Sequence, residues 1–195
     1  MDENVLVVPA DEIKASLQTR FEPGAAQVAI AEANRLRKFL PRSQVETDES
    51  HKQIIPYVCI RHEDSYMLLQ RTKKQSEARL HNKFSLGIGG HINEQEVAAG
   101  AQDLVHAGLL RELNEEITVL AGWKLNLLGT IYDSTTPVGR VHFGIVYELE
   151  VSSLEFTLNE PDLMSGTWTL RSELPGYKQR METWSQLLMD GHIAR

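Results

Sequence analysis

The sequence has a single cysteine, Cys59, among its 195 residues. One cysteine cannot form an intrachain disulfide, and this usage is typical of a reducing compartment. Cys59 stands in the apolar run YVCI, where a cysteine is most simply a small buried hydrophobic residue. The acidic start MDENVLVV differs from the basic start of a secretory signal. Together these features predict a cytoplasmic protein.

Basic residues and long apolar runs are also scarce. Only 20 Lys and Arg stand against 27 Asp and Glu, which gives a net charge of -7. Binding to a nucleic acid polymer needs clustered positive charge, and no apolar stretch is long enough to span a bilayer. We therefore expect neither a nucleic acid polymer nor a membrane as partner. An acidic protein can still act on a phosphorylated small molecule if divalent cations lie between the two.

Hydrophobic residues make up 42% of the chain, enough for one globular domain with an added segment. We predict an N-terminal extension over residues 1–50 and a main domain over residues 51–195. The extension would hold a short strand at NVLVV, a helix from Gly24 to Leu40 that Pro41 ends, and the polar connector RSQVETDES. A docked helix is the favoured interpretation, and a lid or a homodimer element are the alternatives.

From Gln53 onward the pattern is typical of strands. The runs IIPYVCIR and YMLLQRT predict a β-hairpin, and LGIGGHI predicts a further strand. Two more strands, WKLNLLGTIYD and VHFGIVYELEV, flank the turn STTPVG, while GTWTL predicts a short strand and YKQRMETWSQLLMD a closing helix. The order of elements indicates an α/β (α+β) fold with a layered architecture.

A helix over Asp103–Ile117 would gather three carboxylates, those of Glu112, Glu115 and Glu116, within one arc of its surface. Like charges one turn apart destabilise a helix, and Arg111 can offset only part of that repulsion. Bound cations would explain the cluster better, and oxygen ligands without paired Cys or His favour Mg²⁺ or Mn²⁺. An ordinary solvated helix face is the alternative.

The segment RELNEEITV, Arg111 to Val119, resembles the second half of the Nudix hydrolase signature. That signature runs G, five residues, E, seven residues, R-E-U-x-E-E-x-G-U, with U aliphatic. Thr118 stands in place of the final glycine, and Asp103 in place of the first glutamate. Twelve residues separate Gly90 from Asp103, so the loop carries an insertion of seven. Glu94 or Glu96 could therefore take the position of the first glutamate of the signature in place of Asp103. We call the residue at this position the box acid.

The resemblance covers about residues 53–190 and implies a Nudix-type mixed β-sheet sandwiched between helices. It implies that Glu112 and Glu116 are the principal metal ligands, that Glu115 completes the cluster, and that the main-chain carbonyl of Gly90 joins them. Glu115 would be the general base, and Arg111 would orient the acidic cluster.

Three further residues are candidates for substrate binding: His91 after the Gly-Gly pair, Arg71 before the polar loop, and Asp133 before the turn STTPVG. Each has a structural alternative, as a core histidine, a solvated arginine and a turn-forming aspartate. Neither His81 nor His142 has the spacing of a metal ligand with another histidine.

The resemblance implies a metal-dependent hydrolase that cleaves a diphosphate linkage in a nucleoside diphosphate-X-type or related molecule. A Nudix-like nucleotide-binding module without hydrolysis is one alternative, and a diphosphate isomerase similar to isopentenyl diphosphate isomerase is another. An unrelated α/β binding domain with a charged helix is the third. The sequence does not identify the substrate.

Overall fold

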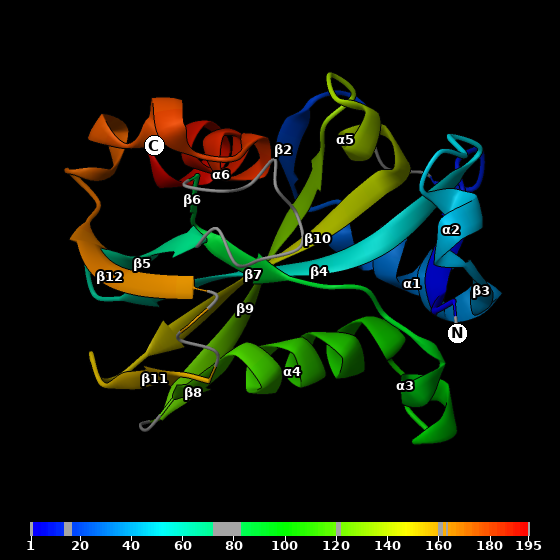
Figure 1. Ribbon diagram of the computed structural model, residues 1–195, viewed down its shortest axis with the longest axis horizontal. Helices are drawn as coiled ribbons and strands as arrows, with labels where there is room; N and C mark the ends of the chain where they lie inside the picture. The colour runs from blue at the N-terminus through cyan, green and yellow to red at the C-terminus, as the bar shows by residue number, and fades with distance from the viewer. Residues whose placement is uncertain are drawn as a thin grey trace.

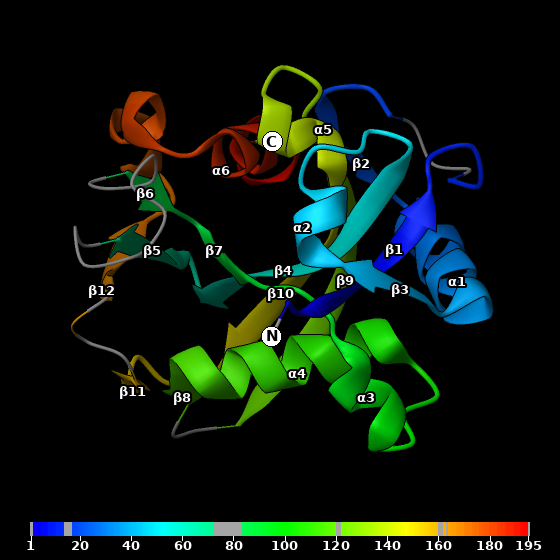
Figure 2. The same ribbon diagram turned by 45° about the vertical axis from the view of Figure 1, so that its right-hand side comes forward.

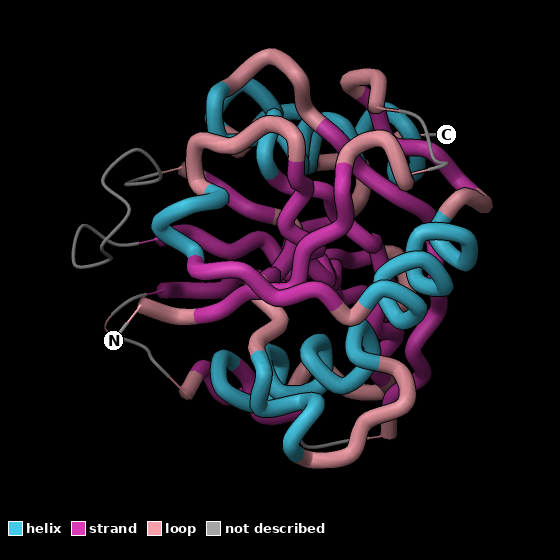
Figure 3. Tube along the Cα trace, turned by 90° about the vertical axis from the view of Figure 1, so that its right-hand side faces the viewer, coloured by secondary structure: helices cyan, strands magenta, loops and turns pink. Residues whose placement is uncertain are grey.

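The computed structural model describes residues 2–13, 17–71, 83–119, 122–159, 162 and 164–194, without the side chains of Arg71 and Val119. One mixed sheet forms the centre, and helices lie on both of its faces (Figures 1 and 3). This arrangement confirms the predicted fold class.

The strands of the described residues are β1 (Asn4–Pro9), β2 (Arg20–Pro23), β3 (Lys38–Pro41), β4 (His51–His62), β5 (Ser65–Arg71), β6 (Phe84–Ser85), β7 (Gly87–Gly89), β8 (Ile117–Val119), β9 (Trp123–Tyr132), β10 (His142–Val151), β11 (Phe156–Leu158) and β12 (Met164–Leu170). The helices are α1 (Ala26–Leu36), α2 (Arg42–Val45), α3 (Glu94–Ala98), α4 (Leu104–Glu116), α5 (Pro137–Val141), α6 (Thr183–Leu188), the 3-10 turns η2 (Leu174–Gly176) and η3 (Lys178–Arg180), and the π-helical turn η4 (Met189–Ile193). No helix in these described ranges is both long enough and apolar enough to cross a membrane.

The long path through the sheet runs in the order β12-β5-β4-β10-β9-β2. The two central strands, β4 and β10, are parallel, with Ile54 opposite Phe143. The predicted hairpin is confirmed, since β4 and β5 pair antiparallel with Arg61 opposite Tyr66. β1 pairs with β3 and with the start of β4, while β7 pairs with the middle of β4. The end of β7 therefore lies beside the central strand pair.

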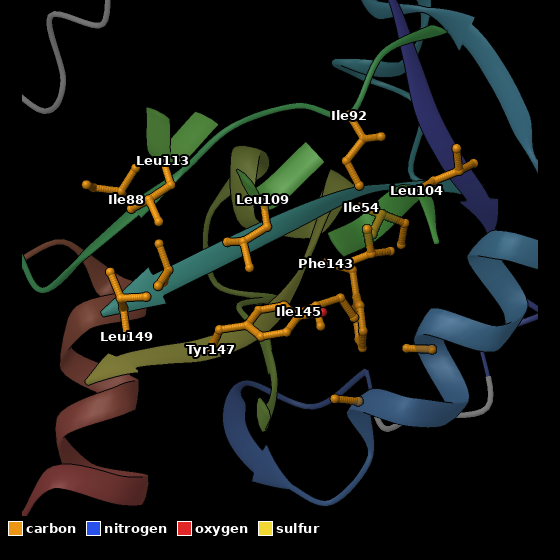
Figure 4. Packing of buried hydrophobic residues seen from close by; sticks show 14 of the residues in the cluster. Ile54, Ile88, Ile92, Leu104, Leu109, Leu113, Phe143, Ile145, Tyr147 and Leu149 are labelled. Atoms are coloured by element: carbon orange, nitrogen blue, oxygen red, sulfur yellow. The ribbon is translucent and has the colours of Figure 1, made fainter. Parts of the chain in front are cut away.

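Apolar residues of β4 and β10 alternate between two cores, one on each face of the sheet. On one face, Phe143 and Ile145 pack with Leu109 of α4 and with the alanines of α1 (Figure 4). On the other face, Val146 and Cys59 pack with residues of α6 and η4. The first core fixes α4 on the sheet, so its outward face is set by the register of its apolar residues.

The predicted helix of Gly24 to Leu40 is wrong at its C-terminal end. The helix α1 stops at Leu36 because Arg37 takes the left-handed conformation, with φ 44°, and donates its N–H to Ala33. Residues 38–41 then form β3, and a turn of helix, α2, occupies part of the predicted connector. The alanines of α1 are buried in the core, as a docked helix requires. The division at residues 50 and 51 stays a prediction.

Two other segments differ from expectation. The turn STTPVG and its next residues contain a short helix, α5, which Thr136 caps by accepting a hydrogen bond from Gly139 N–H. The closing helix predicted over residues 177–190 is shorter, because 3-10 turns fill its first part and α6 begins only at Thr183. Apolar periodicity located these segments but not their bounds.

Candidate active site

The acidic cluster lies on the outward face of α4. The helix begins after Asp103, whose carboxylate accepts hydrogen bonds from the backbone N–H groups of Val105 and His106, both at 3.1 Å. Its apolar face is buried on the sheet. The opposite face presents Glu112 and Glu115, whose side chains are 16% and 57% exposed. Carboxylates near the C-terminal end of a helix oppose the helix dipole, so this cluster needs positive charge beside it.

Arg111 supplies that charge and joins four groups. Its Nε donates to Oε1 of Glu96 at 2.6 Å, and its Nη1 donates to Oε1 of Glu112 at 2.7 Å. The same Nη1 lies 3.2 Å from Oε2 of Glu115. Nη2 donates to the main-chain carbonyl of His91 at 2.7 Å. The guanidinium therefore fixes the carboxylates of α4 against the segment that follows β7.

Gly90 brings the backbone against this cluster. A Cβ atom at position 90 would overlap the carboxylate of Glu112, so any other residue would displace that side chain. Burial raises the pKa of the Glu112 carboxyl, and the hydrogen bond from Arg111 only partly offsets that effect. The backbone of Gly90 therefore lies in close contact with the carboxylate of Glu112, and only glycine allows this contact.

Glu96 contacts Arg111 from α3. Figure 2 shows this helix in the segment between β7 and α4. Its Oε2 accepts a hydrogen bond from Asn93 N–H at 3.1 Å, which together with the Asn93 side chain forms a capping box. The side chain is 3% exposed, and its charge is paired with Arg111. A buried carboxylate held at both oxygens can fix the arginine in one orientation.

No family model matches the chain. The chain shares 30% sequence identity with Tm1382, a candidate Nudix hydrolase with a known crystal structure. The two structures match with a TM-score of 0.80, over 96% of this chain and 97% of that one. The chain belongs to the Nudix hydrolase family. It is also 35% identical to Protein YmaB of Bacillus subtilis, over 97% of both proteins.

The Nudix domain of Shewanella oneidensis NrtR, solved in complex with ADP ribose, shares the fold. Its TM-score is 0.54 at 14% identity, over 71% of this chain and 84% of that domain. That similarity bears on the fold alone. The family assignment rests on Tm1382, which matches nearly the whole chain.

Within the Nudix signature, the structure distinguishes the residues that could stand for its first glutamate. Five residues separate Gly90 from Glu96, as in the signature, and Glu96 contacts Arg111. Asp103 instead caps α4 and accepts a hydrogen bond from Asn34 Nδ2 at 3.1 Å. Glu94 is exposed and accepts from Asn4. Fourteen residues separate Glu96 from Arg111 where the signature has seven, so the insertion follows Glu96.

Thr118 stands where the signature has glycine. In this chain α4 passes directly into β8, because Ile117 is already extended, with φ -144° and ψ 142°. Thr118 pairs with Thr157 of β11 and donates its hydroxyl to Asn159 at 2.9 Å. A position with extended backbone does not require glycine. The pairing of β8 with β11 therefore accommodates threonine at position 118.

The three substrate-binding candidates lie in different settings. His91 is half-buried, and burial lowers the pKa of its imidazole to about 3, with Arg42 and His142 adding repulsion. Asp133 is buried, and both of its carboxylate oxygens accept hydrogen bonds from its own turn, from Thr135 and Thr136. The side chain of Arg71, at the end of β5, lies outside the described residues.

The chemistry of the cluster fits a hard divalent cation. Glu112, Glu115 and Glu116 offer carboxylate oxygens from the C-terminal part of α4, and the backbone of Gly90 lies against the carboxylate of Glu112. This close approach, which a Cβ at position 90 would prevent, supports the fit of a cation to the cluster. Within the described residues, Glu46, His91 and His142 form a separate group in which one ligand atom of each residue lies within 4.8 Å of the other two.

Proposed function

We propose that the protein is a metal-dependent pyrophosphohydrolase that cleaves the diphosphate linkage of a nucleoside diphosphate-X-type or related small molecule. The observation that carries this proposal is the guanidinium of Arg111, which holds Glu96, Glu112, Glu115 and the carbonyl of His91 beside Gly90. Family membership supports the reaction class, since Nudix hydrolases act on diphosphate linkages.

Hydrolysis of a phosphoanhydride breaks one bridging P–O bond and adds water across it. Mg²⁺ or Mn²⁺, when bound, would stabilise charge on the phosphoryl oxygens and lower the pKa of the attacking water. Glu112 and Glu116 would hold the cation, with Glu115 and the carbonyl of Gly90 completing its ligands. These are oxygen donors, as Mg²⁺ and Mn²⁺ prefer.

Glu115 is our proposed general base. Its side chain is 57% exposed, whereas Glu112 is largely covered, so a Glu115 carboxylate oxygen can take a proton from water at the open side of the cluster. Arg111 is a positioning residue, because its donors are directed to the carboxylates and to the backbone. Glu96 in turn fixes Arg111, and we propose it as the box acid in place of Asp103.

On the substrate side, we keep His91, Arg71 and Asp133 as proposed contacts for phosphate or for the group beyond it. His91 is nearest in sequence to the cluster, and its carbonyl is already bound to Arg111. We propose that the substrate is a phosphorylated small molecule. The NrtR domain was solved in complex with one such molecule, ADP ribose. A cytoplasmic location, a homodimer and the exclusion of nucleic acid polymers stay predictions from the sequence.

An isomerase would need a cysteine at the site. Cys59 is buried in the core on the opposite face of the sheet from α4, and its Sγ donates to the carbonyl of Tyr147. Burial raises the pKa of its thiol. These properties favour a structural cysteine and a hydrolase rather than an isomerase.

The test is product release from a panel containing ADP-ribose, a nucleotide sugar, a dinucleoside polyphosphate and a nucleoside triphosphate. Each compound would be tested with Mg²⁺, with Mn²⁺ and with chelator, using wild type, Glu115→Gln and Glu116→Gln. Exposed Glu155, between β10 and β11, gives the matched control Glu155→Gln. We expect metal-dependent turnover in wild type and in the control, and a fall of at least about a hundredfold in the two site variants.

Circular dichroism would confirm that the variants are folded. Turnover of no compound with either metal, in a protein that binds ADP-ribose equally in wild type and site variants, would reject hydrolysis and favour the nucleotide-binding module. Turnover that chelator does not reduce would reject the role of the metal.

A further inference from the structure

A second group of metal-binding side chains lies next to the carboxylate cluster but comes from other elements. Glu46 follows α2, His91 follows the Gly-Gly end of β7, and His142 is the first residue of β10. One ligand atom from each residue lies within 4.8 Å of the other two. Figure 2 shows α2, the start of β10 and the segment after β7 converging in this part of the molecule.

The two histidines face each other through their Nε2 atoms, which are 3.3 Å apart. Two nitrogens that each lie about 2.0–2.1 Å from one tetrahedral zinc ion are separated by about 3.3 Å. The spacing of the imidazoles therefore already equals one edge of a tetrahedral site. A hydrogen bond between the rings gives a similar distance, so the spacing needs support from the other contacts.

The orientation of His142 provides that support. Its Nδ1 lies 2.8 Å from the carbonyl of Val138, and because a carbonyl only accepts, Nδ1 carries the proton. Nε2 then has its lone pair directed at His91. A histidine that donates one ring N–H to a backbone carbonyl and offers the other nitrogen is the usual arrangement of a metal-binding imidazole.

The carboxylate of Glu46 is also held in place. Arg42 Nε donates to its Oε1 at 2.8 Å, which leaves the second oxygen of the carboxylate for another partner. Gln53 supplies one more oxygen, since its Oε1 lies 2.9 Å from His91 Nε2. The group thus has two imidazole nitrogens and one carboxylate, with an amide oxygen or water available for a fourth position.

We propose that Glu46, His91 and His142 bind a divalent transition-metal ion of the Zn²⁺ class. Two imidazoles and a carboxylate form a ligand set that zinc uses in proteins, whereas Mg²⁺ prefers oxygen ligands alone. The site shares no ligand with the carboxylate cluster of α4, and His91 would bind this ion through Nε2 instead of contacting phosphate. The ion would join the N-terminal segment to the start of β10 and to the residue after Gly90.

The test uses the full chain without a polyhistidine tag. The protein would be equilibrated with Zn²⁺ in the presence of excess Mg²⁺, dialysed, and its metal content measured. Co²⁺ would be titrated in parallel, because tetrahedral Co²⁺ has strong visible absorption bands that octahedral Co²⁺ lacks. We expect one Zn²⁺ per chain, a tetrahedral Co²⁺ spectrum, and a rise in melting temperature with Zn²⁺.

The variants are His142→Gln and Glu46→Gln, with His106→Gln on the exposed face of α4 as the matched control. We expect Zn²⁺ affinity to fall at least about tenfold in each of the first two and to be unchanged in the control. Glu46 lies at the surface side of the group, so Glu46→Gln tests the site even if His142→Gln unfolds.

A Glu116→Gln variant separates this group from the carboxylate cluster, and we expect it to retain the ion. Three results would overturn the proposal. They are a wild type that takes up no Zn²⁺, variants that bind Zn²⁺ as tightly as wild type, and loss of the ion in Glu116→Gln but not in Glu46→Gln. The first would leave a hydrogen-bonded histidine pair only.

Discussion

Arg111 Nη2 donates a hydrogen bond of 2.7 Å to the main-chain carbonyl of His91. The bond joins the outward face of α4 to the segment that leaves β7, and so sets the distance between the backbone at Gly90 and the acidic cluster. The other donors of Arg111 go to carboxylates, including that of buried Glu96. One side chain therefore governs both the geometry of the cluster and the stability of the segment between β7 and α4.

Replacing Arg111 with alanine would leave Glu96, with a side chain 3% exposed, as an uncompensated buried charge. We expect the free energy of unfolding to fall by about 3 kcal/mol. Arg111→Lys keeps the charge but cannot reach all four acceptors, so a smaller loss is expected. Urea denaturation would measure both. Equal stability of wild type and Arg111→Ala would contradict the role of this ion pair.

Exchanging the two candidate box acids for their amides would show which one acts on the site. Glu96→Gln weakens the hold on Arg111, and we expect turnover to fall on the order of 10-fold to 100-fold through misplacement of the cluster. Asp103→Asn should keep near wild-type turnover and stability, because Asn and Asp are equally good helix caps. Steady-state kinetics on the substrate found in the panel is the measurement. The opposite ranking would return the role to Asp103.

Gly108 lies in the middle of α4, where alanine would favour the helix by about 1 kcal/mol. A Cβ at this position would come within 2.7 Å of Cγ1 of Ile92, which is fully buried. Overpacking of this kind costs about 1–3 kcal/mol, so we expect Gly108→Ala to be destabilising despite the better helix propensity. A thermal melt of Gly108→Ala beside wild type is the measurement. A rise in melting temperature for the single variant would show that Ile92 moves freely.

Glu148 of β10 gives the protein an acid-sensitive contact away from the site. Burial acts to raise the pKa of its carboxyl, but hydrogen bonds from His192 and Arg61 outweigh this, and the net pKa is lowered. A lowered pKa in the folded state adds stability above the unfolded value of about 4.3, and that stability is lost as the pH falls through the folded value. We therefore expect wild type to lose stability below about pH 4 more steeply than Glu148→Gln. The measurement is the denaturation midpoint of wild type and of Glu148→Gln at several pH values between neutral and acid. If the contact contributed nothing, the two midpoints would change with pH in parallel.

Much of the core could be predicted from the sequence, because the apolar residues of β4, β5 and β10 alternate or run continuously and α4 has helical periodicity. The end of α1 could not be predicted, because the residue with positive φ is Arg37 and not a glycine or an asparagine, which are the residues that usually adopt this conformation. Interaction of β3 with β1 then depends on pairing across 30 residues, which local pattern does not encode.

The candidate site was partly visible. Glu112, Glu115 and Glu116 follow from helix geometry. The signal for Glu96, the five residues that separate it from Gly90, was present in the sequence. The capping box that puts Glu96 in a helix is also encoded, as Asn93 followed by Glu96. Spacing along the chain gave no sign that His142 lies beside His91, since tertiary structure alone brings together residues 51 positions apart.

The pairing of β1 with the first residues of β4 has a consequence for shortened chains. Val7 lies opposite Gln53 and Pro9 opposite His51. The first residues of β4 therefore pair with β1 along one edge and with β10 along the other. A chain that began at residue 51 would present these backbone groups, and the apolar faces beside them, to solvent. Unpaired strand edges recruit other strands, so such a fragment would be expected to self-associate rather than to report on the isolated domain.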